Sequence, residues 1–236
     1  MNKTALFALA LFTAAATALY SDCKALPIYD VAGDFSTNSN PNGVWSYGYS
    51  ATLGGSMTLH QETGVETGVL EFRRTDLYGG APGVYKNVSG STLVNQGVYV
   101  APGQLFFHPG IGPTGEFDII RFTSPEDDLY DVAGVFTGLD SMYGTSTYVH
   151  IQKNGSSIWN GDVEGFGATQ SFNTTVQLNA GDRLDFVVGL GQRQSPLGDS
   201  TGVDATISVV PEPSALGLLL LTLPFSGRFS RRPKAS

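Results

Sequence analysis

Three histidines and one serine motif are the first residues whose types could do chemistry. His60, His108 and His150 lie far apart, and none has an H-x-x-x-H or H-E-x-x-H spacing, so no zinc-ligand set is visible. Gly198–Gly202 reads Gly-Asp-Ser-Thr-Gly and matches the G-x-S-x-G motif of hydrolases. That motif needs a strand before it and a helix after it, whereas residues 203–209 alternate like a strand. The sequence therefore favours a tight loop over a serine nucleophile.

Asp and Glu side chains are more numerous than histidines, and their carboxylates are suitable ligands for calcium. Calcium takes carboxylate and backbone oxygens and gains when several converge. Asp140, Asp199 and Asp204 lie at expected loops or strand ends, and we predict that they are the candidates for one structural calcium ion, with no other cofactor. A glycosidase would need two carboxylates about 5–10 Å apart across a cleft, and no motif marks such a pair. A secreted carbohydrate-active enzyme therefore stays an alternative without assigned catalytic residues.

Aromatic side chains are the other candidates for ligand binding. Trp45, Tyr47 and Tyr49 alternate, so they share one face of a strand. Tyrosine and tryptophan combine a flat apolar body with a polar tip, which suits sugar recognition. The same face could instead be the core of the domain, and the sequence favours that alternative. His108, at the end of an expected strand, and Trp159, in an expected hairpin, complete the candidate ligand surface.

The charge balance narrows the class of partner. The chain has 236 residues, with 13 Lys and Arg against 21 Asp and Glu, so its net charge is -8. It lacks the excess of Lys and Arg residues that is typical of nucleic-acid-binding proteins. Residues 1–25 and 211–236 hold six of the basic and two of the acidic residues, which leaves 7 against 19, a net of -12, for the part between them. That charge disfavours polyanionic partners and leaves neutral glycans or divalent cations.

The elements that must position these residues are expected to be strands. Between residues 26 and 209 no sustained helical spacing appears. Short alternating runs, separated by turn signals about every 8–12 residues, predict a single all-β domain, a jelly-roll-like antiparallel sandwich. Asn154-Gly155 between the alternating runs 147–153 and 156–159 predicts a hairpin with a type I′ turn. The other expected strands are 44–49, 69–72, 84–86, 105–108, 117–122, 130–136, 172–178, 184–190 and 205–210.

One short internal sequence repeat raises the question of whether the domain arose by duplication. Residues 29–35 and 130–136 agree at six of seven positions, and no further matches follow either copy. We therefore interpret the repeat as two strands in similar environments. The single cysteine, Cys23, excludes an intramolecular disulfide.

The two ends of the chain are typical of sorting signals. Lys3, an uncharged stretch and the small residues Ala16-Thr17-Ala18 predict a Sec signal peptide over residues 1–18, with cleavage as late as residue 25. At the other end, residues 210–236 hold Pro211-Glu212-Pro213, a short apolar stretch and a basic cluster. As a helix, about 15 apolar residues span about 22 Å, which is shorter than the hydrocarbon core of about 30 Å. We therefore expect a transient inner-membrane anchor. Its basic cluster is Arg228, Arg231, Arg232 and Lys234.

This three-part order resembles the PEP-CTERM sorting signal, a segment that is also labelled as the C-terminal domain of an ice-binding protein. The resemblance implies that an exosortase, a membrane protease or transpeptidase, recognises Pro211, Glu212 and Pro213. It also implies a place in a Gram-negative envelope associated with exopolysaccharide. Residues 40–48, 108–110 and 199–207 resemble a group of secreted PEP-CTERM proteins whose domain looks like a jelly roll.

The expected function follows from the ends of the chain more than from its middle. We expect an exported cell-envelope or extracellular-matrix protein that is not an enzyme and that binds polysaccharide. Its expected partners are the Sec translocon, signal peptidase, an exosortase-like protease and exopolysaccharide, and not nucleic acid. A purely structural surface or adhesion protein stays a further alternative beside the enzyme.

Overall fold

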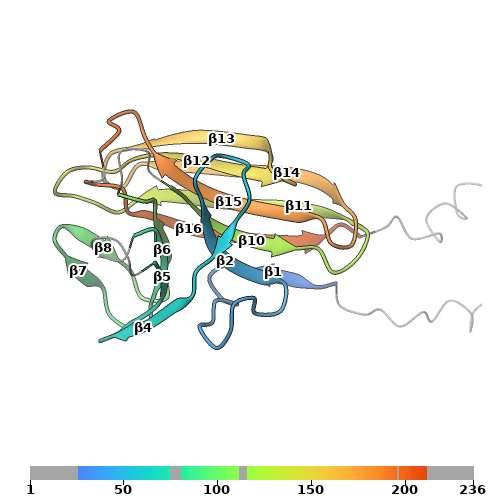
Figure 1. The fold of residues 1–236 in the computed structure, drawn as a ribbon, viewed down its shortest axis with the longest axis horizontal. Helices are drawn as coiled ribbons and strands as arrows, with labels where there is room; N and C mark the ends of the chain where they lie inside the picture. Colours follow the sequence, from blue (N-terminus) through green and yellow to red (C-terminus); the bar gives the residue numbers. More distant parts are fainter. Residues whose placement is uncertain (1–25, 75–80, 112–115, 196, 212–236) are drawn as a thin grey trace, which may run out of the picture.

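The computed structural model describes residues 26–74, 81–111, 116–195 and 197–211 (Figure 1). Within these ranges the chain forms sixteen strands and no helix, so none of the described elements is a helix that could cross a membrane. The predicted signal peptide, Glu212 and Pro213, the apolar stretch and the basic cluster lie outside the described residues.

The strands form two large antiparallel sheets and one small one. Sheet A has the order β14 (Thr169–Leu178), β11 (Asp128–Gly138), β16 (Thr201–Val209), β9 (Leu105–His108), β6 (Gly83–Asn87), β5 (Val69–Arg73) and β4 (Glu62–Glu66), and β1 (Ile28–Asp30) also pairs with β16. Sheet B has the order β13 (Ser156–Glu164), β12 (Ser146–Lys153), β15 (Arg183–Leu190), β10 (Phe117–Thr123), β2 (Trp45–Ser50) and β3 (Thr58–Leu59). The small sheet pairs β7 (Leu93–Asn95) with β8 (Val98–Val100).

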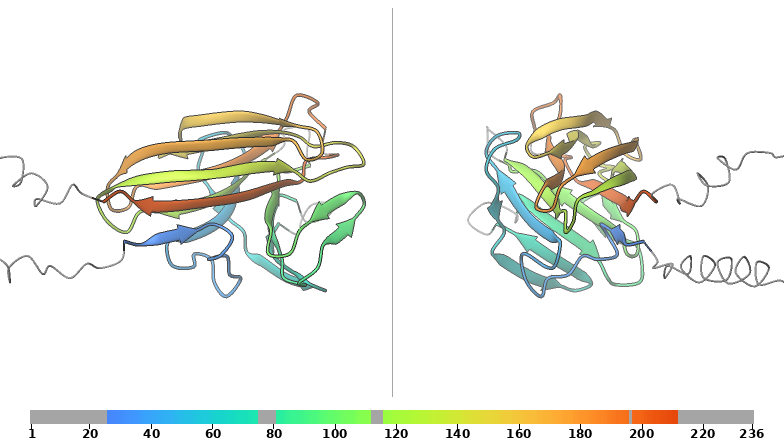
Figure 2. Two further views of the ribbon diagram at one scale, coloured as in Figure 1. Left: turned by 180° about the vertical axis from the view of Figure 1, so that it is seen from behind. Right: turned by 90° about the vertical axis from the view of Figure 1, so that its right-hand side faces the viewer.

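The pairing is nested, which is the topology of a jelly roll. β1 pairs with β16, β10 with β15, β11 with β14 and β12 with β13, and these four antiparallel pairs alternate between sheet A and sheet B. The predicted all-β sandwich is confirmed. The segment from β2 to β9 is inserted between β1 and β10 and widens both sheets, and Figure 2 shows it extending to one side of the long strands.

Each run that was expected to be a strand coincides with one. The runs at 44–49, 69–72, 84–86, 105–108, 117–122, 130–136, 172–178, 184–190 and 205–210 overlap β2, β5, β6, β9, β10, β11, β14, β15 and β16. The hairpin of β12 and β13 is also confirmed, because Asn154 and Gly155 have φ of 50° and 84°, the positive values that a type I′ turn needs. The short strands β3, β4, β7 and β8 were not predicted, whereas β1 lies at the start of the run 29–35, which was interpreted as a strand.

The repeat between residues 29–35 and 130–136 places two strands against the same neighbour. β1 and β11 both pair with β16. Tyr29 and Tyr130 both pack on Phe122, with ring centroids 4.9 and 5.8 Å from it. The similar sequences therefore reflect similar positions and not a duplicated domain.

The core lies between the inner faces of the two sheets. Its largest fully buried side chains are aromatic: Tyr47, Phe72, Phe107, Phe122, Tyr130, Phe136 and Phe186. At the edge formed by β13 and β14, Trp159 stacks on Phe136 at 5.9 Å and contacts Phe172 at 5.4 Å, which closes the space between the sheets.

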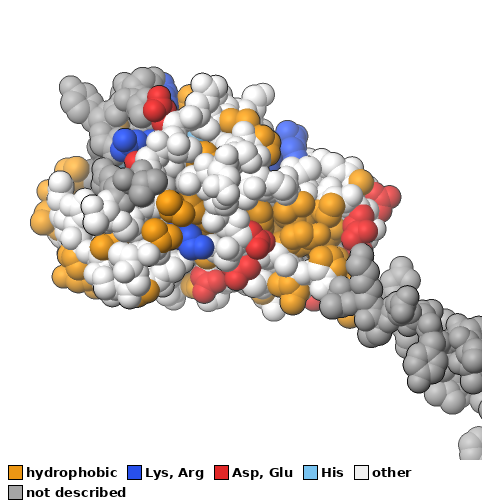
Figure 3. All heavy atoms as spheres, turned by 90° about the horizontal axis from the view of Figure 1, so that it is seen from below, with side chains coloured by type: hydrophobic (Ala, Val, Ile, Leu, Met, Phe, Trp, Pro, Cys, Tyr) orange, Lys and Arg blue, Asp and Glu red, His pale blue; other side chains and the backbone are white. Residues whose placement is uncertain are grey.

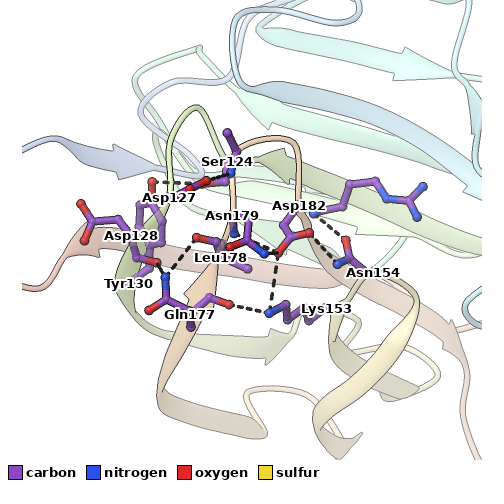
Figure 4. Close-up of polar contacts among 12 residues, drawn as sticks. Ser124, Asp127, Asp128, Tyr130, Lys153, Asn154, Gln177, Leu178, Asn179 and Asp182 are labelled. Atoms are coloured by element: carbon purple, nitrogen blue, oxygen red, sulfur yellow. Dashed lines mark hydrogen bonds and ion pairs between the residues drawn. The ribbon is translucent and has the colours of Figure 1, made fainter.

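Polar bonds tie three turns together at one end of the sandwich (Figure 4). Asp182 accepts a bond from the amide of Asn179 at 2.9 Å and another from the side chain of Asn154 at 2.8 Å. Lys153 lies 3.7 Å from its carboxylate. The amide of Asn179 and the side chain of Asn154 lower the pKa of Asp182. The neighbouring turn is held in the same way, since Asp127 accepts from the amide of Ala180 at 2.7 Å.

The turn at Gly155 lies against the backbone of Gly54, and substitution of Gly155 tests this contact. Gly155→Ala forces an L side chain to adopt a φ of 84° and places its Cβ 2.8 Å from the carbonyl oxygen of Gly54. The control is Gly167→Ala, where φ is 72° and a Cβ meets nothing within 4 Å. We expect Gly167→Ala to lower the free energy of unfolding by about 1–2 kcal/mol, and Gly155→Ala to lower it further. Urea unfolding measures both, and equal losses would contradict the contact with Gly54.

Candidate functional site

The three alternating aromatics share one face, and that face runs from the core to an open pocket. Trp45 and Tyr47 are only 2% and 0% exposed. For these two residues the alternative that the sequence favoured, the core of the domain, is confirmed, and they are removed from the candidate ligand surface because they are packed between the sheets. Trp45 lies 5.5 Å from Phe122, and Tyr47 stacks on Phe72 at 5.3 Å. Tyr49, one step further along β2, is half-buried and lines a pocket.

Of the other two residues of that predicted surface, Trp159 lies elsewhere, whereas the backbone of His108 hydrogen-bonds to Asp118. Trp159 is half-buried and belongs to the closed edge of the core. His108 is half-buried at the end of β9, and its Nδ1 lies 2.6 Å from the carbonyl oxygen of Pro109. Burial lowers the pKa of His108. The structure therefore does not bring Trp159 to the pocket of Tyr49.

We call that pocket the edge pocket, and it opens between β2, β3 and β5. β3 pairs with β2 at Gly48, where any side chain would collide with the carbonyl oxygen of Thr58, 2.3 Å from the position of a Cβ. This close pairing brings the start of the next segment beside Tyr49. The pocket encloses about 250 Å³ and is lined by Tyr49, Thr58, Leu59, His60, Gln61, Glu62, Arg73 and Arg74.

A buried histidine–aspartate pair stands beside the edge pocket. The Nε2 of His60 lies 2.7 Å from the Oδ1 of Asp118, and neither side chain is exposed. Asp118 is opposite Tyr49 in the register of β10 and β2, and the ring of Tyr49 lies 5.5 Å from that of His60. Burial raises the pKa of Asp118, while the charge and hydrogen bond of His60 act to lower it. The Nδ1 of His60 has no hydrogen-bond partner among the described residues.

Two arginines complete the edge pocket, and each is neutralised. Arg74 lies 2.8 Å from Glu116 and places its guanidinium 4.9 Å from the ring centre of Tyr49. Arg73 lies 3.3 Å from Glu71. The pocket therefore combines apolar ring surface with planar hydrogen-bonding groups whose charges are balanced, and that chemistry suits a neutral, hydroxyl-rich ligand.

Sequence reasoning missed His60 and Asp118 as a pair. They are 58 positions apart and form no motif. The residue pattern of β10 did contain a clue, because Asp118 lies on the same face as Ile120 and Phe122, which point into the core. A carboxylate at a core-facing position needs a partner, and His60 is that partner.

The candidates for calcium separate in the structure. Asp140 and Asp199 are buried, at 5% and 1% exposure, and interact electrostatically, whereas Asp204 is exposed on β16. The Oδ1 of Asp140 already accepts from the amides of Met142 and Tyr143, both at 2.8 Å. In the described ranges, no group of three or more His, Cys, Asp or Glu side chains is placed to hold a metal ion. A calcium ion therefore stays a prediction.

Asp199 is the most perturbed carboxylate near the loops that join β11 to β12 and β15 to β16. Both of its oxygens lack a hydrogen-bond partner within the described part of the chain. Burial raises the pKa of Asp199 to about 7, with Arg193 acting to lower it and Asp140 and Glu164 acting to raise it. The folded protein therefore holds a proton on Asp199 at a pH where the unfolded chain has released it.

An apolar surface patch lies at the same end of the molecule. The rings of Tyr99 and Phe166 are 43% and 53% exposed, with centroids 5.4 Å apart. Val94, 56% exposed, is opposite Tyr99 in the pairing of β7 and β8. We call these three residues the loop-end patch, and Figure 3 shows hydrophobic side chains gathered at the end of the molecule that carries β7 and β8. The sequence did not predict this patch.

Comparison with protein-family models finds no match for the chain, and comparison with curated proteins finds none either. Some solved structures are weakly similar. Rabbit GITRL is 16% identical, with a TM-score of 0.29, over 40% of this chain and 74% of that one. A CBM51 module from Clostridium perfringens GH95, solved with methyl-galactose, is 16% identical, with a TM-score of 0.34, over 51% and 80%. A family 35 carbohydrate-binding module from Clostridium thermocellum is 15% identical, with a TM-score of 0.30, over 50% and 85%. Likenesses of this size assign neither a family nor a ligand to the chain.

The raised pKa of Asp199 predicts how stability changes with pH in calcium-free buffer. Because the pKa is about 7 in the folded state and about 4 in the unfolded state, stability is lost as pH rises from 4 through 7. Asp199→Asn removes this loss, so the variant gains thermal stability relative to the natural chain at pH 8 and not at pH 4. Asp204→Asn, at an exposed position on β16, is the control. Melting curves at both pH values check this, and an unchanged pH dependence in Asp199→Asn would refute it.

Proposed function

We propose that this chain is an exported, non-catalytic polysaccharide-binding protein of the cell envelope or extracellular matrix. The observation that carries the proposal is the edge pocket, where the ring of Tyr49 stands beside His60 and Arg74 and each of these is oriented by a carboxylate. A sugar presents C–H faces and hydroxyl groups together. A pocket that offers an aromatic surface and fixed hydrogen-bonding groups is complementary to both.

The size of the pocket limits how a polysaccharide enters it. About 250 Å³ is below the range of about 300–1,000 Å³ that drug-sized ligands occupy. The pocket therefore takes one sugar ring, from a chain end or a side branch, and not a run of the main chain. The balanced charges of Arg73 with Glu71 and Arg74 with Glu116 favour a neutral ring.

The same carboxylates argue against catalysis. A glycosidase needs one carboxylic acid and one carboxylate that both face the scissile bond. Asp118 is hydrogen-bonded to His60, while Glu71 and Glu116 form ion pairs with Arg73 and Arg74 respectively. These contacts fix the hydrogen-bond donors of His60, Arg73 and Arg74 in place, as a binding site requires.

Export and sorting are the second part of the proposal. The residues that support it are the predicted signal peptide, Pro211-Glu212-Pro213 and the basic cluster at Arg228, Arg231, Arg232 and Lys234. In this proposal the Sec translocon and signal peptidase act first. The apolar stretch then anchors the chain in the inner membrane until an exosortase-like protease acts at the tripeptide.

Binding is tested with exopolysaccharide purified from the cells that make the protein, together with an array of neutral and acidic glycans. We expect Tyr49→Ala to weaken binding at least tenfold in calorimetric titration, because the pocket loses its ring. The control is Tyr99→Ala, which removes an exposed ring of the loop-end patch and should leave the affinity unchanged. If Tyr99→Ala lost binding and Tyr49→Ala kept it, the edge pocket would not be the sugar site.

Sorting is tested separately, by mass spectrometry of the protein from its native envelope. We expect the mature chain to end at or near Pro213 and to lack the basic cluster. Substitution of Glu212 by alanine should leave the tail attached and the protein in the inner membrane. A native protein that retains Lys234 in cells with an exosortase would rule out the processing step.

A further inference from the structure

β14 is an edge strand whose own sequence carries none of the usual features that block pairing, and the one charged group that the described residues bind to its backbone is Lys153 of β12, which donates to the carbonyl oxygen of Gln177. It is ten residues long, from Thr169 to Leu178, and pairs with β11 on one side without a bulge. It contains no proline, no glycine and no charged residue. Natural proteins normally protect such an edge with charge, proline, a bulge or short length, because its free amides and carbonyls would otherwise pair with another strand.

The other sheet edges are protected in these ways. β4 has five residues and contains the exposed Glu62, and β3 has only two residues. β13 contains Asp162 and Glu164, and its pairing with β12 has a bulge. The contrast singles out β14 among the described edges.

We propose that β14 is the dimer interface of this protein and pairs antiparallel with β14 of a second copy across a two-fold axis. An antiparallel pair of identical strands is an isologous contact, in which each residue of one copy meets its counterpart in the other. The two sheets A then join into one continuous sheet.

The side chains on the outer face of β14 complement themselves in this arrangement. The exposed residues are Thr169, Ser171, Asn173, Thr175 and Gln177. When the axis passes at Asn173, it faces the Asn173 of the second copy, and Ser171 faces Thr175. Cross-strand pairs of Ser and Thr stabilise antiparallel strands.

The charge of the protein favours this strand over the rest of the surface. Residues 26–210 carry 7 basic and 19 acidic side chains, so two copies repel each other over most of their surface. β14 has no charge of its own. A contact along β14 therefore places no charged side chain of the strand itself opposite a like charge.

The test compares two asparagines on two edge strands. Asn173→Lys places two ammonium groups opposite each other at the axis, whereas Asn160→Lys puts the same change on exposed β13. By sedimentation of the full chain, we expect the natural protein and Asn160→Lys to have twice the mass of one copy at tens of micromolar. Asn173→Lys should be monomeric with an unchanged circular dichroism spectrum. A monomeric natural protein, or a dimeric Asn173→Lys, overturns the proposal.

A cysteine pair gives a readout that does not depend on weakening the strand. In a Cys23→Ser background, Asn173→Cys places two cysteines directly opposite each other. Their Cα atoms are then about 4.5–5.5 Å apart, within the range of a disulfide. Mild oxidation should link Asn173→Cys chains into dimers and leave Asn160→Cys chains single. Failure of Asn173→Cys to link, or equal linking of both, overturns the pairing.

Discussion

The pairing of β16 with three other strands is the constraint on which the rest of the structure depends. β16 pairs with β1, β9 and β11, and its residues Val203, Ala205, Ile207 and Val209 point into the core. The contact with β9 is only three residue pairs long. Through it, the inserted strands β6, β5 and β4 join sheet A, while β2 and β3 join sheet B through β10. The edge pocket has one wall from each route, Tyr49 from β2 and Arg74 just after β5, so its geometry follows from both attachments.

Alternation along the chain predicted the long strands because burial decides their pattern. In β16 the buried Val203, Ala205 and Ile207 alternate with the exposed Asp204 and Thr206, and this period of two is visible in the sequence alone. β3, β7 and β8 have two or three residues each, which is too short to show a period. Their positions come from tertiary contacts, such as the close approach of Thr58 to Gly48.

The aromatic residues of β2 show which features of the site the sequence predicts and which it does not. Alternation places Trp45, Tyr47 and Tyr49 on one face, and the structure agrees. Whether that face is core or pocket changes along the strand, because Phe72 covers Tyr47 whereas Arg74 lies over Tyr49 at the pocket. The partner of His60 is equally invisible, since a contact across 58 positions depends on how β3 and β10 are placed on either side of β2.

Taken together, the two proposals explain how a site for a single sugar ring could hold a polymer. A pocket for one sugar ring buries little surface, and small ligands gain only limited free energy from such contacts. Two pockets in one dimer turn the second binding event into an intramolecular one and raise the overall strength by avidity, provided that both can reach the same polymer. A polysaccharide offers many equivalent chain ends or branches, so it meets that condition where a monovalent ligand does not. Dimerisation through β14 would therefore matter for binding to polymer and leave binding of a single sugar unchanged.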